Sequence, residues 1–185
     1  MNNMNELSIS NVVGGGSLGK ELDLISIAET NYKHFDTKYE PESFSAVVFR
    51  SKGSGPTIML YRSGKYSIAG GKSIEETRTV FDKFCSDIQD NTGLELRPEL
   101  EIRYFVTTGD LGRSINLSAA VIALGMDKTE YEPEQFPGLF YRPKSEDWFV
   151  ILFSSGSIVV DGSPDMEMLE SAYQEVDSKL RKNNI

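Results

Sequence analysis

The chain contains Tyr39-Glu-Pro-Glu-Ser-Phe-Ser-Ala-Val-Val-Phe-Arg50, and 92 residues further on it contains Tyr131-Glu-Pro-Glu-Gln-Phe-Pro-Gly-Leu-Phe-Tyr-Arg142. The same offset also matches Tyr61-Arg-Ser-Gly64 with Phe153-Ser-Ser-Gly156, and Gly70 with Gly162. Several matches in the same order indicate an internal duplication. Two copies of about 90 residues predict a pseudo-twofold domain rather than a solenoid, which stacks at least three shorter repeats. We therefore expect one repeat over residues 1–92 and a second over residues 93–185.

Both copies have the same order of predicted elements. In the first copy, alternation of apolar and polar residues predicts a strand, a glycine run predicts a turn, and helical spacing predicts a short helix. Three further strands and a long helix follow, for which Ser73 is a suitable N-cap with Glu76 three residues later. The expected ranges are strand 7–13, turn 14–16, helix 22–28, strands 46–50, 57–61 and 65–69, and a helix from 73 to 88.

The second copy repeats this pattern after an expected hinge at residues 90–93. Its expected ranges are strands 101–107, 138–142, 148–153 and 157–160, and a helix over 165–181. Consecutive strands joined by tight turns predict an antiparallel sheet, and the helices must cover one face of it. The fold class is therefore α+β, with two pseudo-symmetric repeats that form a curved sheet with helices on the convex face. The other face stays bare and partly apolar, which predicts a binding partner.

Composition excludes several classes of protein. Hydrophobic residues make up 39% and charged residues 25% of the chain, as in a folded globular protein. No apolar run approaches the roughly 20 residues of a membrane helix, and residues 1–6 lack the features of a signal peptide. We therefore expect a soluble intracellular protein. Cys85 is the single cysteine and His34 the single histidine, which argues against a disulfide, a metal site, a cofactor and an enzyme of the serine-triad class.

The net charge of −9 and the pI near 4.7 argue at first against nucleic acid as the partner, since phosphates are usually neutralised by clusters of Lys and Arg. Net charge does not say where the charges lie. An acidic outer surface with a local basic face remains compatible with DNA binding.

The repeated motifs resemble those of the TATA-binding protein family. Tyr-Glu-Pro-Glu-x-Phe, Phe-Ser-Ser-Gly, Ser-Gly-Lys and Gly-x-Lys occur in order, with a long helix closing each copy, from about Leu7 to Leu180. The resemblance implies a saddle whose concave sheet widens the minor groove of TATA-like DNA, with aromatic wedges that replace lost base stacking. It assigns the wedge role to four residues, of which Tyr61 stands where the family has Phe. These residues are Phe44, Tyr61, Phe136 and Phe153.

The resemblance also assigns residues to the centre of the saddle and to the DNA backbone. In the family, an Asn and a Val from each first strand meet the minor groove, and the first copy keeps them as Asn11 and Val13. The second copy has Tyr104 and Val106 there, and Ala69 and Asp161 stand where the family has paired Thr residues. Phosphate contacts are implied for Arg50, Lys65, Lys72 and Arg142, whereas Ser157 and Pro164 replace the usual lysines of the second copy.

The loop of the second copy implies a protein partner. In the family it binds transcription factor B, and the corresponding residues here are Glu132, Pro133, Glu134 and Gln135. Two hypotheses follow. The first is a general initiation factor, cytoplasmic and nucleoid-associated in a cell without a nucleus, that binds and bends promoter DNA and recruits transcription factor B. The alternative is a diverged paralogue that binds TATA DNA weakly and acts by binding transcription factor B.

Overall fold

The computed structural model describes residues 7–94, 98–143 and 146–185. They form two compact units, one comprising Asn11–Arg103 and the other residues 7–10 with Tyr104–Ile185. Strands β1 (Ser8–Ser17) and β6 (Glu101–Asp110) each contribute residues to both units. Within the described ranges, no helix is long and apolar enough to cross a membrane.

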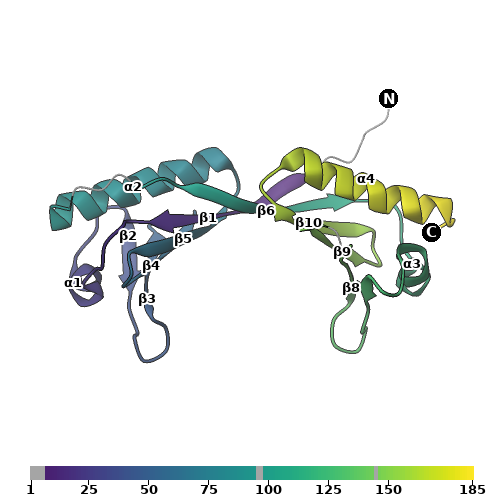
Figure 1. The fold of residues 1–185 in the computed structure, drawn as a ribbon, viewed down its shortest axis with the longest axis horizontal. Coiled ribbons are helices and arrows are strands. Elements are labelled where there is room, and N and C mark those ends of the chain that lie inside the picture. Colours follow the sequence, from purple (N-terminus) through teal and green to yellow (C-terminus); the bar gives the residue numbers. More distant parts are fainter. Residues whose placement is uncertain (1–6, 95–97, 144–145) are drawn as a thin grey trace. The chain divides into compact units, whose positions relative to one another are not determined.

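The unit Asn11–Arg103 is an antiparallel sheet with helices packed on it (Figure 1). Its strand order is β2-β3-β4-β5-β1, and each of these neighbours pairs antiparallel. Its remaining elements are α1 (Leu24–Glu29), β2 (Phe35–Lys38), β3 (Ala46–Ser51), β4 (Thr57–Tyr61), β5 (Lys65–Gly71) and α2 (Ile74–Thr92).

The second unit has the matching order β6-β10-β9-β8-β7, again antiparallel. Its elements besides β6 are α3 (Leu117–Leu124), β7 (Thr129–Glu130), β8 (Gly138–Tyr141), β9 (Phe149–Phe153), β10 (Ser157–Ser163) and α4 (Met166–Lys182). The predicted strands 46–50, 57–61, 65–69, 101–107, 138–142, 148–153 and 157–160 are all confirmed to within a few residues at their ends.

The long helices begin at side-chain caps. Ser73 accepts a hydrogen bond from the backbone N–H of Glu76 at 3.0 Å, and the Glu76 carboxylate accepts one from the N–H of Lys72. These bonds satisfy N–H groups that the first turn of a helix leaves free. The helix then packs Phe84 edge-to-face on Phe49 of β3, with ring centroids 5.0 Å apart. The predicted helices from 73 and over 165–181 are confirmed.

The expected turn at residues 14–16 is wrong, because these glycines lie inside β1. A Cβ on Gly14 would lie 2.7 Å from the carbonyl oxygen of Glu101, and a Cβ on Gly15 would lie 2.6 Å from that of Tyr66. Both distances are shorter than a Cβ tolerates, so glycine serves here to let neighbouring backbones approach.

The expected hinge at residues 90–93 and the start of the first helix also need correction. Residues 90–92 belong to α2, and the helix ends only at Gly93, whose φ of 66° lies in the left-handed region that glycine favours. Helix α1 begins at Leu24 rather than at residue 22, because the side chain of Asp23 caps the N–H groups of Ile25 and Ser26. The elements β2, α3 and β7 were not predicted.

Candidate nucleic-acid interface

In the unit Asn11–Arg103, one face of the sheet carries the helices and the other is open. Along β4 and β5, Ile58, Leu60 and Ile68 are fully buried against the helices. The alternating residues point the other way, and Met59 pairs with Ser67 across the two strands. These half-buried residues form the first open face, which comprises Asn11, Val13, Val48, Thr57, Met59, Tyr61, Ser67 and Ala69.

Asn11 is held by the backbone of β5. Its side-chain Oδ1 accepts a hydrogen bond from the N–H of Gly70 at 2.7 Å. The acceptor end of the carboxamide is thereby engaged, so the NH₂ end keeps its two donors for an outside partner. Val13 lies two residues along β1, on the same face. The structure thus brings together the pair of residues that the sequence assigned to the groove floor.

An aromatic pair lies at the β3–β4 end of the first open face. Phe44 is 42% exposed although it is a large apolar side chain. Its ring meets that of Tyr61 edge-to-face, with centroids 6.3 Å apart. The backbone N–H of Phe44 bonds to the carbonyl of Glu40, which closes the loop that carries the ring. Two residues assigned as wedges are therefore adjacent and supported by a tight turn.

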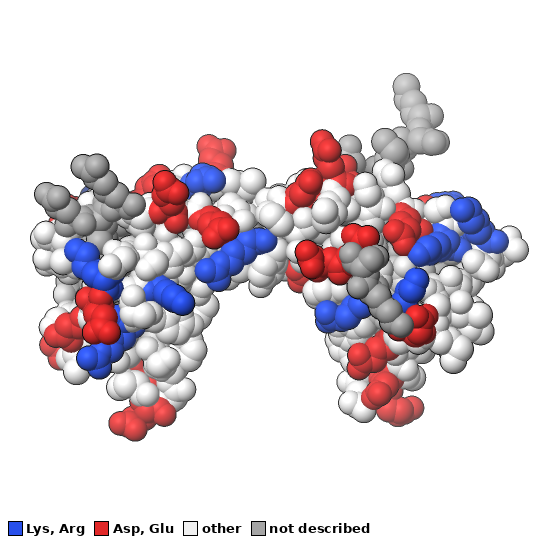
Figure 2. Space-filling view, in the orientation of Figure 1, with Lys and Arg blue, Asp and Glu red and all other residues white. Residues whose placement is uncertain are grey.

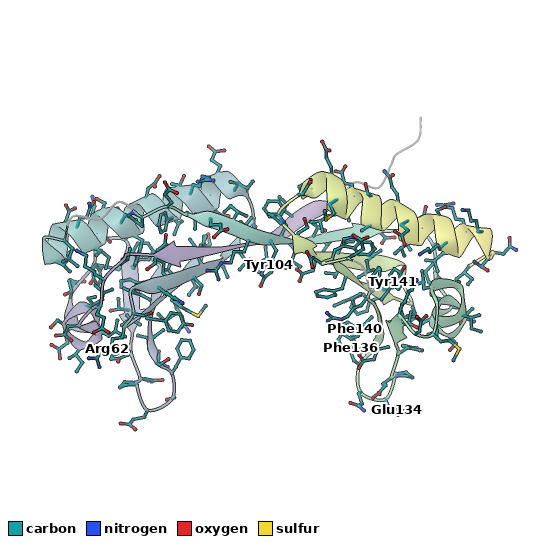
Figure 3. All side chains as sticks on the ribbon, in the orientation of Figure 1. Arg62, Tyr104, Glu134, Phe136, Phe140 and Tyr141 are labelled. Carbon is teal, nitrogen blue, oxygen red and sulfur yellow. The ribbon has the colours of Figure 1, made fainter. Side chains whose placement is uncertain are left out.

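The second unit repeats this arrangement with more aromatic side chains. Phe136 is 38% exposed, and its ring centroid lies 5.9 Å from that of Phe153 and 5.2 Å from that of Phe140. Figure 3 shows Phe136 and Phe140 side by side at β8. The second open face comprises the half-buried residues Tyr104, Val106, Phe140, Phe149, Ile151, Phe153, Val159 and Asp161.

Sequence reasoning did not assign Phe140 and Phe149 to the site. The signal that could have found Phe149 is its spacing, because it lies four residues before Phe153 on one strand and so shares its face. Phe140 is likewise four residues beyond Phe136. The corresponding positions of the first copy are Val48 and Thr57, so the two open faces differ most where these rings stand.

Asp161 stands on the second open face beside a cation. It pairs with Phe149 of β9 on one side and with Val106 of β6 on the other. The guanidinium carbon of Arg142 lies 4.3 Å from the centroid of the Phe149 ring. Burial raises the pKa of the Asp161 carboxyl, and this outweighs the lowering by the backbone N–H of Gly162 and by the charge of Arg142.

The basic residues assigned to phosphate contacts are distributed unevenly. Arg50, Lys65 and Lys72 are exposed in the first unit. Arg142 is exposed in the second unit but stacks on Phe149, and exposed Ser157 and Pro164 carry no charge where the first unit has Lys65 and Lys72. At the assigned positions, the first unit therefore carries more exposed positive charge than the second.

The loop between β7 and β8 carries the residues assigned to a protein partner. Glu132, Pro133, Glu134 and Gln135 are all exposed. The carbonyl of Glu132 accepts hydrogen bonds from the N–H groups of Gln135 and Phe136, and the side chains of Glu132 and Gln135 also bond. Figure 2 shows the acidic side chains at the tip of this loop, where Figure 3 labels Glu134.

The chain matches one family model in two separate segments. The family model described as "Transcription factor TFIID (or TATA-binding protein, TBP)" matches residues 6–91 and 99–183. The chain is 39% identical to a TATA-box-binding protein of Haloarcula marismortui over 94% of its length and 92% of that protein. It is 36% identical to TATA-box-binding protein C of Halobacterium salinarum over 95% of its length and 98% of that protein.

A solved structure agrees with the sequence comparison. The TBP of Methanococcus jannaschii superposes with a TM-score of 0.80 at 34% identity, over 96% of this chain and 99% of that one. The expected fold class is therefore confirmed, and the expectation of a transcription factor rather than an enzyme agrees with the family. Its duplicated sequence, the matching strand order of its two units and these matches show that the chain belongs to the TATA-binding protein family of transcription factors.

Proposed function

We propose that this protein is a general transcription initiation factor that binds TATA-like promoter DNA through the minor groove, bends it, and recruits transcription factor B. The observation that carries the proposal is an aromatic pair at the same point of each open face, in which an exposed ring contacts a half-buried one, Phe44 with Tyr61 and Phe136 with Phe153. Exposed apolar rings are unfavourable in water. A ring that inserts between base pairs is shielded from water, and it also replaces the stacking that a kink removes.

The two wedge pairs are not equal. The hydroxyl of Tyr61 has to keep a hydrogen-bond partner when the ring enters a base step, whereas Phe153 has no polar atom to satisfy. The first unit compensates for this weaker wedge with the exposed cations Arg50, Lys65 and Lys72. We infer that the first repeat contributes more of the phosphate attraction and the second more of the stacking.

The exposed Glu132–Gln135 loop supports transcription factor B as the protein partner. A loop with exposed carboxylates offers a surface for a cationic partner, and because the loop leads directly into Phe136, a partner bound there would lie next to DNA kinked at Phe136. A factor that acts on promoters works at the chromosome, so we infer a cytoplasmic, nucleoid-associated protein in a cell without a nucleus.

One observation favours a second function. Tyr104 puts a bulky ring where the first repeat has the amide of Asn11, and Asp161 puts a carboxylate on the second open face, where an acceptor-lined A·T groove offers it no donor. A diverged paralogue that binds TATA DNA weakly and regulates by occupying transcription factor B would show this combination. Binding of the purified protein to a TATA duplex, with and without transcription factor B, separates the two functions.

The experiment that tests the proposal measures bending by energy transfer between dyes at the two ends of a TATA duplex. We expect wild type to shorten the end-to-end distance, and Phe136→Ala and Phe153→Ala each to weaken both bending and affinity. Ile122→Ala is the matched control, because Ile122 is 74% exposed on α3 and outside the open face. Bending that equals wild type in both Phe variants would contradict the wedge assignment.

A further inference from the structure

The carboxylate of Asp161 lies on the second open face, near the end of β10. On β10, Ile158 and Val160 are buried, whereas Asp161 is half-buried on the other face. Its cross-strand neighbours Phe149 and Val106 are half-buried too and offer no hydrogen bond from their side chains. The carboxylate is therefore a polar group within an apolar stretch of the second open face.

The hydrogen bonds around Asp161 leave it with acceptor capacity for a ligand. In the first repeat, the N–H of Gly70 is satisfied by Asn11. Gly162 is the corresponding glycine of the second repeat, and its backbone N–H lowers the pKa of the Asp161 carboxyl, although burial raises it overall. A carboxylate has about four lone-pair sites, so one backbone donor does not exhaust it. The charge of Arg142, whose guanidinium lies over the Phe149 ring, also lowers the pKa of the Asp161 carboxyl, although less than burial raises it.

Base pairs differ in what they offer such a group. In the minor groove, A·T and T·A pairs expose acceptors only, whereas a G·C pair adds the N2 amino group of guanine, which is a donor. An acceptor-only side chain on a minor-groove face is repelled by the first two and matched by the third. We propose that Asp161 is a specificity-determining residue that accepts a hydrogen bond from a guanine N2 amino group, so that this protein prefers an element with a G·C pair at one position.

This inference rests on the proposed function, because it requires DNA on the second open face. The Asp161 carboxylate, which disfavours a uniform A·T element, would then favour an element that contains a G·C pair. The first repeat has Ala69 at the corresponding place, opposite Thr57, so the preference is confined to one half of the element.

The test uses base analogues that add or remove only the amino group. Each position of an eight-base-pair A·T element is replaced in turn by G·C, by inosine·C, which lacks the amino group, and by 2,6-diaminopurine·T, which adds it to an A·T-like pair. We expect one position at which the amino group strengthens binding by about 3- to 10-fold in both comparisons, the change that one hydrogen bond gives.

Variants test whether Asp161 causes the preference for the amino group. Asp161→Ala should abolish it, and Ala69→Asp should create a second preference at another position of the element. Glu170→Ala is the control, since it removes one negative charge from the exposed surface of α4 without touching the open face. Binding that is indifferent to the amino group at every position, or a preference that survives in Asp161→Ala, would overturn the inference alone. Failure to bind any duplex, with or without transcription factor B, would overturn the proposed function with it.

Discussion

The side-chain Oδ1 of Asn11 accepts a hydrogen bond from the backbone N–H of Gly70 at 2.7 Å, and this fixes which end of the carboxamide faces outward. An amide that rotates freely presents either a donor or an acceptor to a ligand. Here the acceptor is engaged by β5, so the donors are offered to the open face. The A·T minor groove exposes acceptors, and the orientation of Asn11 matches it before DNA arrives.

The variant Asn11→Asp tests the acceptor end and the donor end of this side chain separately. The carboxylate still accepts the bond from Gly70, so we expect a melting temperature close to that of wild type. The outward donors become an acceptor, and we expect affinity for a TATA duplex to fall by about ten-fold or more, because a buried mismatch with an acceptor costs roughly 1–3 kcal/mol. Equilibrium binding and thermal unfolding are measured on the same preparation.

Asn31→Asp is the control for the added charge, because Asn31 is exposed in the same unit and outside the open face. An equal loss of affinity in both variants would show that net charge, and not the donor, is responsible.

The loop between β7 and β8 gives a prediction about the protein partner. Glu132→Arg and Glu134→Arg reverse exposed charges, so we expect loss of recruitment of transcription factor B to the protein–DNA complex, with binary DNA binding changed little. The matched controls are Glu40→Arg and Glu42→Arg in the corresponding loop of the first repeat. Gel shifts with and without the partner distinguish the cases. Loss of DNA binding without transcription factor B would mean that the loop supports the aromatic wedge instead.

Much of the fold follows from the sequence, because the duplication tests each assignment twice. A strand predicted at residues 57–61 is supported by its copy predicted at residues 148–153, and the structure has strands at Thr57–Tyr61 and Phe149–Phe153. The run Gly14-Gly-Gly16 has a tertiary cause, because the carbonyls of Glu101 and Tyr66 leave no space for a Cβ at its first two positions, and the carbonyl of Glu99 and the Tyr66 hydroxyl leave none at the third. Local sequence cannot distinguish a glycine that turns the chain from one that admits a neighbouring strand.

The family resemblance assigns a residue only where a family position names it, and it leaves out residues that packing alone brings to the open face. Asn11 and Phe136 stand at named positions, whereas Phe140 is linked to them only through its contact with Phe136. The engagement of Asn11 by Gly70 depends on the register of β1 with β5, and the strand bulges at this point, between Val12 and Gly14. Such a bond is not visible in a linear sequence.

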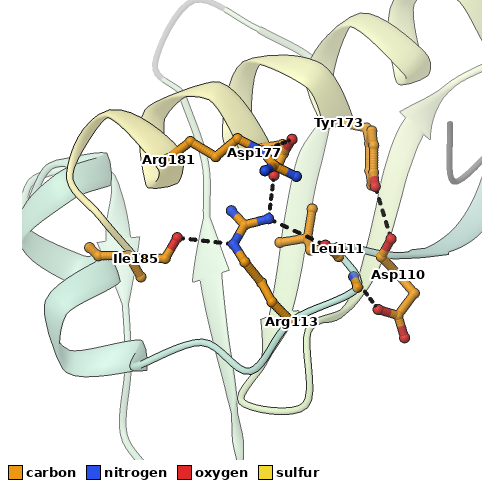
Figure 4. A network of polar contacts seen from close by, with 8 residues as sticks. Asp110, Leu111, Arg113, Tyr173, Asp177, Arg181 and Ile185 are labelled. Atoms are coloured by element: carbon orange, nitrogen blue, oxygen red, sulfur yellow. Dashed lines mark hydrogen bonds and ion pairs between the residues drawn. The ribbon is translucent and has the colours of Figure 1, made fainter. Parts of the chain in front are cut away.

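A network of charges links α4 to the end of β6 and gives a prediction about stability (Figure 4). The carboxylate of Asp177 accepts a hydrogen bond from Arg113 at 2.7 Å and another from Arg181 at 2.7 Å, and Arg113 also bonds to the carbonyl of Ile185. Burial raises the pKa of Asp177, but the bonds from Arg181 and Arg113 outweigh burial and lower it below the usual value.

Asp177→Asn should therefore lower the free energy of unfolding at pH 7 by about 1–3 kcal/mol, the cost of weakening bonds to a partly buried charge. Because the folded-state pKa is lowered, the contribution of Asp177 is present above the unfolded pKa of about 3.9 and is lost as the pH falls through the folded pKa. Urea unfolding at pH 7, 5 and 3.5 should show a difference that shrinks only at the lowest pH. Glu170→Gln, on the exposed side of the same helix, should show no such difference, and a pH-independent deficit in Asp177→Asn would contradict the ionic account.

The second open face gives the last prediction, which concerns the double variant Tyr104→Asn with Asp161→Thr. Tyr104 is the counterpart of Asn11, and Figure 3 shows it near the middle of β6. Restoring an amide donor and removing a carboxylate should raise affinity for a uniform A·T element by on the order of ten-fold or more, since each poorly matched contact in such an interface costs roughly 1–3 kcal/mol. Affinity for a G·C-containing element should rise less or fall, because the group that accepts from the guanine amino group is gone.

The comparison has to be made at several salt concentrations, since phosphate attraction to Arg50, Lys65 and Lys72 changes both affinities together and leaves their ratio nearly constant. If the double variant and wild type have the same ratio of affinities for the two elements at every salt concentration, Tyr104 and Asp161 do not meet the groove floor, and the second repeat would then have to bind DNA through its aromatic residues alone.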